Sequence, residues 1–136
     1  MSIFAHLIQQ SQGHRPSQLR LLYATKATAP INADEILFVS RLVELAKRQS
    51  GIDVALRLHL TGVSKDDIAN AKGLPEQTVV GRVSGEDLEA ALGAENDRSG
   101  TVCYVCGPPA MTDSMVEYLS GRKGMESRRV LCEKWW

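Results

Sequence analysis

The stretch TVCYVCGPPAM, residues 101–111, joins a run of strand-forming residues to the first turn of a helix. The run up to Cys106 is mostly apolar and predicts a buried strand. Gly107 has no Cβ and lets another group approach its backbone closely. Proline is tolerated in a first helical turn, because its missing N–H has no helical partner there. We therefore expect a strand that ends at Cys106 and a helix that runs to about Ser120.

This strand-to-helix turn has two interpretations. The positive end of the helix dipole would face the crevice beyond the strand and would favour an anion such as a pyrophosphate. A valine at Gly107 is then expected to block the crevice without unfolding the domain. Alternatively, the Gly-Pro-Pro sequence is only a stiff connection that binds nothing. The residues alone leave both interpretations open.

The segments around this stretch alternate between strand-like and helix-like patterns. Short connections between such segments predict an α/β fold, with a parallel sheet covered by helices on both faces. Besides residues 101–106, the expected strands are residues 18–25, 54–61 and 129–132. The expected helices are residues 2–10, 34–49, 85–92 and 109–120, and residues 62–76 are expected to form a loop with a helical turn after Ser64.

Parallel sheets of this kind bind ligands beyond the carboxyl ends of their strands. Thr25 and Thr61 stand at two such ends, Cys106 stands at a third, and the C-terminus follows the last strand. These positions are therefore the candidate ligand contacts. His59 is interpreted as a strand-face or edge residue rather than as a ligand.

Composition argues against several classes of function. The chain has 136 residues, enough for one domain with a buried core, and 43% of them are apolar, which argues against a disordered chain. Its 16 lysine and arginine residues balance 16 aspartate and glutamate residues, so no basic excess indicates nucleic acid. No apolar run is long enough to span a membrane, and residues 1–6 do not resemble a secretory signal.

The three cysteines do not indicate the disulfide framework of a secreted protein. Cys103 and Cys106 form a C-x-x-C sequence. In a strand, however, positions three apart point to opposite faces and cannot share one metal ion. No second such pair completes a tetrahedral site, so no metal site is predicted.

Several motifs, in their order along the chain, make it resemble a known family. They are LRLLYATK at 19–26, LRLHLT at 56–61, Gly81-Arg82-Val83 before a helix, CGPPAM at 106–111, and EKWW at 133–136. Over nearly its whole length the chain resembles the pyridine-nucleotide-binding domain of the ferredoxin–NADP reductase superfamily. The resemblance implies a Rossmann-like parallel sheet and binding of NAD or NADP.

In that family a barrel domain binds FAD, a C-terminal domain binds NADH or NADPH, and hydride passes from nicotinamide C4 to flavin N5. The resemblance implies catalytic roles for Cys106, beside the nicotinamide, and for Glu133, near the flavin–nicotinamide contact. Trp135 or Trp136 would cover the flavin ring. The positions implied to contact the dinucleotide are Thr25 and Thr61 at the adenosine half, and Gly107, Pro108, Pro109 and Met111 along the crevice.

The residues by themselves also allow simpler interpretations. Cys106 would serve as a small buried apolar residue, and the two terminal tryptophans would pack on the domain surface. The choice between NADH and NADPH stays open, since Lys26 and Lys65 are available to a 2′-phosphate but form no dedicated pair. A basic cluster is interpreted as a solvated helix end, with docking of a phosphate or of an acidic electron-acceptor protein as the alternative; it comprises Arg122, Lys123, Arg128 and Arg129.

In the family, the domain opens with a strand and a glycine-rich GGxGxxP turn, followed by the helix expected here at residues 2–10. We therefore expect this chain to lack the first, central strand, the glycine-rich loop and the FAD-binding barrel, as a truncated isoform or an incomplete gene model would. The strands at Leu19 and Thr101 would then each have an unpaired edge.

Two functions follow from this resemblance. The chain is expected to be the NAD(P)H-binding module of a flavin-dependent oxidoreductase, or else a catalytically inactive interaction or regulatory protein. The family also implies a mitochondrial location, with a targeting segment upstream of Met1, and otherwise a cytoplasmic one.

Overall fold

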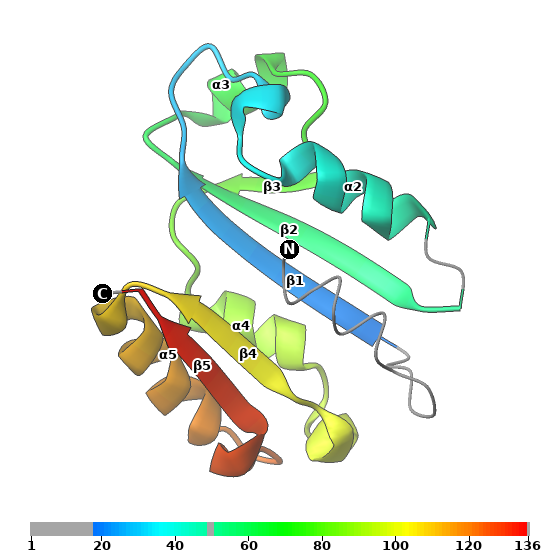
Figure 1. The fold of residues 1–136 in the computed structure, drawn as a ribbon, viewed down its shortest axis with the longest axis vertical. Coiled ribbons are helices and arrows are strands. Elements are labelled where there is room, and N and C mark those ends of the chain that lie inside the picture. Colours follow the sequence, from blue (N-terminus) through cyan, green and yellow to red (C-terminus); the bar gives the residue numbers. More distant parts are fainter. Residues whose placement is uncertain (1–17, 49–50, 136) are drawn as a thin grey trace. The chain divides into compact units, whose positions relative to one another are not determined.

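The computed structural model describes residues 18–48 and 51–135 and divides the chain into two compact units (Figure 1). The units are Met1–Val83 and Ser84–Trp136. Each unit has its own sheet and its own core. The helix expected at residues 2–10 lies outside the described residues.

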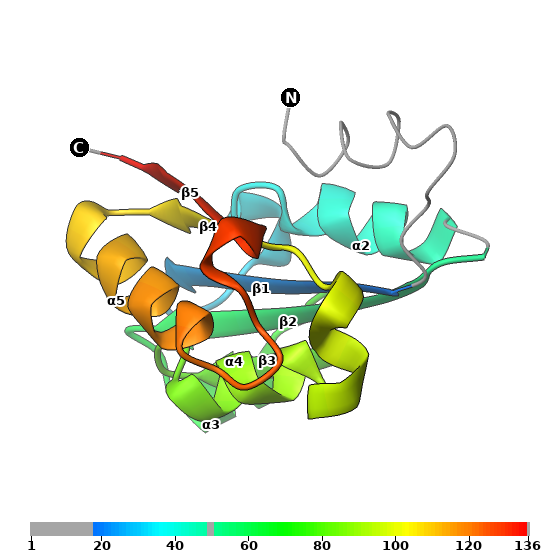
Figure 2. The same ribbon diagram turned by 90° about the horizontal axis from the view of Figure 1, so that it is seen from below.

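Three parallel strands, β1 (Gln18–Lys26), β2 (Asp53–Thr61) and β3 (Gln77–Val80), form the sheet of the first unit in that order (Figure 1). β2 is therefore the central strand and β1 an end strand. Helices α2 (Val39–Arg48) and α3 (Lys65–Asn70) lie on opposite faces of this sheet (Figure 2). The strands predicted at residues 18–25 and 54–61 are confirmed, and each is one residue longer than predicted.

The core of the first unit lies between β2 and α2. Leu58 and Leu60 on β2 have no exposed surface, and Val39 on α2 packs with them and with Ile31. His59 is also buried, at 1% exposure. Its interpretation as a strand-face residue is confirmed, and an edge position is wrong, because β2 has a neighbouring strand on each side.

The helix predicted at residues 34–49 is interrupted near its start. A short 3-10 helix, η1 (Ala33–Glu35), comes first, and Phe38 then adopts a φ of 68° immediately before α2. This left-handed conformation is unfavourable for a residue that carries a Cβ. The apolar pattern predicted one continuous helix over residues 34–49. Instead the backbone changes direction at Phe38, and Val39, the first residue of α2, is buried in the core.

The helical turn predicted after Ser64 is confirmed as α3. Ser64 and Asp67 form a capping box: the Ser64 hydroxyl accepts from the Asp67 N–H at 3.1 Å, and the Asp67 carboxylate accepts from the Ser64 N–H at 2.8 Å. Strand β3 was not predicted. Its four residues are too few for a clear alternation, and its pairing with β2 depends on tertiary context.

Two parallel strands, β4 (Cys103–Gly107) and β5 (Val130–Lys134), form the sheet of the second unit. Helices α4 (Gly85–Leu92) and α5 (Pro109–Ser120) pack with them around one core, and the carboxyl end of β4 runs directly into α5 (Figure 1). The buried residues of that core are Leu92, Val105, Leu119 and Val130. Two 3-10 helices precede the strands, η2 (Glu95–Gly100) before β4 and η3 (Ser127–Arg129) before β5.

The two helices predicted in the second unit are confirmed, whereas the strand predicted at residues 101–106 is wrong by one or two residues at each end, because β4 runs from Cys103 to Gly107. Ser84 caps α4 and forms a capping box with Asp87. The strand predicted at residues 129–132 instead extends to Lys134, because Gly107 of β4 pairs with Lys134 and lengthens the ladder. Glu133 consequently lies within a strand rather than beyond it.

The predicted α/β class, with parallel strands and flanking helices, is confirmed. β1 and β4 belong to different sheets, and within residues 18–48 and 51–135 neither has a strand on its second edge. No helix in this described part of the chain is long and apolar enough to cross a membrane.

Candidate functional site

The β4–β5 ladder brings two of the predicted site residues together. Cys106 and Glu133 are register partners in this parallel pair of strands. Partners in register point to the same side of a sheet, so the thiol and the carboxylate share one face. Both residues are exposed. The interpretation of Cys106 as a small buried residue is therefore wrong, whereas its placement at a strand end beside Glu133 suits a ligand contact.

Cys103 lies on the other face of β4, as the alternation of side chains predicted. It is partly buried against the core of the second unit. Burial raises the pKa of the Cys103 thiol. The two thiols of the C-x-x-C sequence therefore point to opposite faces. Among the described residues, no group of three or more His, Cys, Asp or Glu side chains could hold a metal ion.

Tyr104 is a residue of this site that the sequence analysis missed. Its hydroxyl donates to Oε2 of Glu133 at 2.7 Å. Tyr104 precedes Cys106 by two positions on β4, and side chains two apart in a strand share a face. The alternation was visible in the sequence, but the hydrogen bond depends on how β4 and β5 are aligned.

The hydrogen bond predicts a measurable titration of Tyr104. Donation to Glu133, with smaller contributions from burial and neighbouring charge, raises the pKa of Tyr104 to about 12 from an ordinary 10.0. Because the pKa of Tyr104 is higher in the folded state, its hydrogen bond to Glu133 stabilises the fold fully below pH 10. This contribution to the free energy of unfolding is lost as the pH rises through about 12. Phenolate absorbance should show this transition, and Glu133→Ala should return it toward 10. Subtracting the absorbance titration of Tyr104→Phe from that of the unmodified chain shows which part of the transition belongs to Tyr104 rather than to the other two tyrosines.

The Gly-Pro-Pro turn connects β4 to α5 as predicted. Helical hydrogen bonding begins with the Thr112 N–H, which donates to the Pro108 carbonyl at 2.9 Å, and no side chain caps the helix. The N–H groups of Ala110 and Met111 precede that first helical bond. Such unpaired donors at a helix N-terminus are suited to an anion.

Gly107 is buried on the side of β4 that faces α5. A Cβ at this position would overlap the terminal methyl group of Met111. The carbonyl of Gly107 accepts from the buried Thr112 hydroxyl at 3.1 Å. Gly107 therefore permits close packing between strand and helix, and the Met111 methyl group occupies the place that a Cβ at Gly107 would take.

Trp135 continues the alignment of β5 beyond its last residue. Its backbone N–H donates to the Gly107 carbonyl at 2.8 Å, and its side chain is 51% exposed. An indole exposed to this extent is compatible with both predictions made for it, packing on the domain surface and covering a flavin ring. Trp136 lies outside the described residues, so its predicted role has no structural description.

Thr25 and Thr61 lie at the carboxyl edge of the sheet in the first unit. Thr61 pairs in register with Lys26, and its carbonyl accepts from the Ala27 N–H at 2.9 Å. Gly62 follows with a φ of 82°, and a Cβ there would come within 2.9 Å of the Ala27 carbonyl oxygen. The chain therefore turns closely at this edge, which keeps both threonines at strand ends as predicted.

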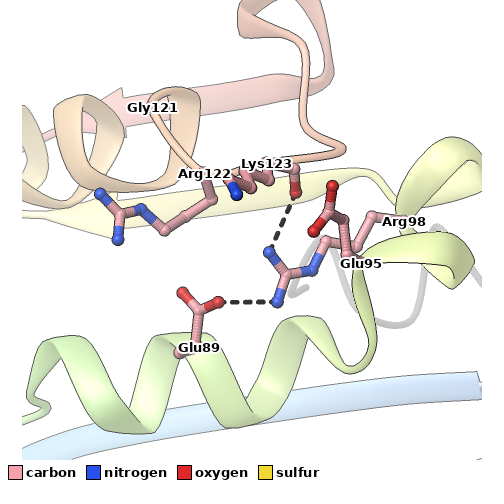
Figure 3. A pocket seen from close by; sticks show the side chains of 6 residues that line it. All are labelled: Glu89, Glu95, Arg98, Gly121, Arg122 and Lys123. Carbon is pink, nitrogen blue, oxygen red and sulfur yellow. Dashed lines mark hydrogen bonds and ion pairs between the residues drawn. The ribbon is translucent and has the colours of Figure 1, made fainter.

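A cavity of about 300 Å³ lies on the second unit (Figure 3). Neither Cys106 nor Glu133 is among the residues that line it. Arg98 occupies it with 6% of its side chain exposed. Its guanidinium bonds to Glu89 at 2.8 Å and donates to the Lys123 carbonyl at 3.0 Å (Figure 3). The Glu89–Arg98 hydrogen bond is the largest cause that lowers the pKa of Glu89. These bonds join α4, η2 and the turn after α5, so Arg98 has a structural role.

The basic cluster predicted near the end of α5 is not one solvated surface. Arg129 is only 14% exposed and donates to the carbonyls of Arg98, Thr101 and Gly124. Arg122 stacks over the Tyr118 ring at 4.2 Å. The solvated interpretation is therefore wrong for Arg129, because its Nη1 and Nη2 atoms donate to backbone carbonyls within the unit.

Parallel strands with flanking helices place the chain in the α/β class, in which ligands generally bind beyond the carboxyl ends of the strands. Over 134 residues, 97% of its length, the chain is 30% identical to oxidoreductase NAD-binding domain-containing protein 1 of Danio rerio. It is 28% identical over 125 residues to the Xenopus laevis protein of that name and 27% over 124 residues to the Homo sapiens one. These matches cover 92% and 91% of the chain.

The chain spans less than half the length of these relatives, 44% of the Danio rerio protein and 35% of each of the other two. No family model matches the chain. No solved structure matches it.

Proposed function

We propose that this chain is the NAD(P)H-binding module of a flavin-dependent oxidoreductase, in which hydride passes from the nicotinamide to FAD. The observation that carries the proposal is the pairing of Cys106 with Glu133 at the end of β4, directly before the Gly-Pro-Pro turn. The name of the relatives, which align with nearly the whole chain, supports it. The proposal assigns FAD binding mainly to a domain outside these 136 residues.

The second unit offers groups that suit a dinucleotide. The unpaired N–H groups at the start of α5 suit a pyrophosphate. In this proposal Pro108 and Pro109 shape the turn, and Met111 supports it from behind.

Orientation is the main contribution that the chain's own residues would make. FAD supplies the hydride acceptor when it is bound. Cys106 and Glu133 would hold the nicotinamide ring in one orientation, because both side chains emerge on the same face of a rigid ladder. Trp135 would cover the flavin ring with its exposed indole and exclude water.

Protection of thiols tests this proposal on the unmodified chain. NADH at about ten times its dissociation constant should slow alkylation of Cys106 roughly tenfold, since only the unoccupied fraction reacts. Cys132 is an internal control, because it is also exposed but lies in register with Val105, on the opposite face. Peptide mass spectrometry measures each rate separately. ADP-ribose, which lacks the nicotinamide, should bind without protecting Cys106.

Two results would count against the proposal. Calorimetric titration that detects no saturable binding of NADH or NADPH would reject it. Equal protection of Cys106 and Cys132 would show that any binding occurs elsewhere on the chain.

The unpaired strand edges support a second candidate function, that of a non-catalytic interaction or regulatory protein. In the described part of the chain, β1 and β4 each have one edge without a neighbouring strand. Such edges are templates for pairing with another chain. This candidate predicts stable association with a protein partner and no oxidation of NADH. A chain that elutes as a monomer and oxidises NADH in the presence of FAD would exclude it.

A further inference from the structure

The hydrogen bond between Tyr104 and Glu133 constrains the site proposed for the nicotinamide. The Tyr104 hydroxyl is 2.7 Å from Oε2 of Glu133, and the two residues are 29 positions apart in the sequence. Tyr104 itself pairs in register with Leu131, two residues before Glu133. The bond therefore runs diagonally across the ladder, on the face that Cys106 shares.

An exposed glutamate without such a contact would sample several rotamers. A hydrogen bond to an ionised carboxylate is stronger than one between neutral groups and also restricts the direction of the carboxylate. The tyrosine ring is rigid and is attached to the same strand as Cys106. The bond therefore holds one oxygen of Glu133 toward Tyr104, while strand pairing holds the Glu133 backbone beside Cys106.

We propose that Tyr104 is a positioning residue for the nicotinamide, because its hydroxyl fixes the Glu133 carboxylate beside the Cys106 thiol. This inference rests on the proposed function of the Cys106–Glu133 site. It assigns Tyr104 no contact with the hydride. Its effect passes through Glu133, so the two residues act as a pair and not as independent contributors.

Two ligands separate this role from a general contribution to folding. NADH carries the nicotinamide, whereas ADP-ribose shares the adenosine and pyrophosphate and lacks the nicotinamide. Tyr104→Phe is expected to raise the dissociation constant for NADH roughly three- to tenfold, the effect of one lost hydrogen bond to a charged group that is partly exposed. The dissociation constant for ADP-ribose should not change.

Tyr118→Phe is the matched control. Its hydroxyl also bonds to a glutamate, Glu89, at 3.4 Å, but it belongs to the contacts around Arg98. This variant is expected to bind both ligands as the unmodified chain does. Thermal unfolding of each variant verifies that it is folded before titration.

A double-mutant cycle completes the test. Once Glu133→Ala has removed the carboxylate, adding Tyr104→Phe should not weaken NADH binding further. Additive losses, equal losses for NADH and ADP-ribose, or no loss at all would each overturn the positioning role. Binding of NADH by the unmodified chain keeps the proposed function intact in those cases, whereas a chain that binds neither ligand defeats both proposals.

Discussion

Arg98→Ala is expected to lower the free energy of unfolding of the second unit by roughly 2–4 kcal/mol, at about 0.5–1.5 kcal/mol for each lost hydrogen bond. Arg98 donates through Nε and Nη2 to the Gly93 carbonyl, at 3.0 and 2.7 Å, and through Nη1 to the Lys123 carbonyl at 3.0 Å. Its side chain is 6% exposed. Alanine would leave these carbonyls without their donor and would also leave a space beside Glu89.

Tryptophan fluorescence during urea unfolding measures this effect selectively. Both tryptophans of the chain belong to the second unit, so their signal reports on the residues that Arg98 joins. The unfolding midpoint should fall while the dependence on denaturant stays the same.

Two further variants test whether the stability lost in Arg98→Ala comes from the hydrogen bonds of its guanidinium group. Arg98→Lys should recover little stability, because one ammonium group cannot reproduce the planar guanidinium that reaches Gly93, Lys123 and Glu89 together. Arg128→Ala is the matched control, since Arg128 is 80% exposed and its ion pair with Glu126 is a surface contact. It should leave the midpoint unchanged. An unchanged midpoint for Arg98→Ala would contradict the structural role of these bonds.

Gly107→Val is expected to destabilise the second unit by about 1 kcal/mol, the low end of the cost of adding bulk to a packed interior, because the overlapping methyl group ends the flexible Met111 side chain and can shift. The sequence predicted that valine would block a ligand crevice and leave the domain folded. In the structure a side chain at Gly107 points at α5, where its Cβ would overlap the Met111 methyl group. The valine methyl groups would also approach the Thr112 hydroxyl, which bonds to the Gly107 carbonyl. The expected primary effect is therefore on packing, with NADH binding weakened as a consequence.

A second substitution distinguishes an effect of Gly107→Val on packing from a direct effect on NADH binding. Adding Met111→Ala to Gly107→Val should recover part of the lost stability, because it removes the atoms that overlap. Gly100→Ala is the matched control, since no atom lies within 4 Å of a Cβ at that position and its φ is not positive. A Gly107→Val chain with unchanged stability but no NADH binding would restore the prediction made from sequence.

Much of the fold could be predicted because its signals are local. Apolar, strand-forming runs located β1 and β4, alternation located β2, and Ser84 with Asp87 marked the start of α4 as an N-cap. Where prediction was wrong, a tertiary contact decided the outcome. The backbone breaks at Phe38 as Val39 enters the core, and β3 exists because it pairs with β2.

In the candidate site, too, some residues could be predicted from local motifs and others could not. Cys106, Glu133 and the Gly-Pro-Pro turn were identified from motifs, and the family resemblance implied a place near the nicotinamide for Cys106 and for Glu133 separately. Tyr104 was not identified, because its hydrogen bond joins residues 29 positions apart. Arg129 was misinterpreted for a related reason: its partners are backbone carbonyls up to 31 positions away, which no residue pattern displays.

The sequence by itself therefore determined the parallel α/β class, the presence of the strand that contains Cys106 and the helix that starts at Pro109, since each depends on interactions within a few residues. Only the tertiary structure decided that Glu133 lies within β5 opposite Cys106, that Tyr104 bonds to it, and that Gly107 makes room for Met111. Strand register and side-chain packing set these contacts. Both arise when segments distant along the chain come together, because burial and hydrogen bonding there outweigh local preference.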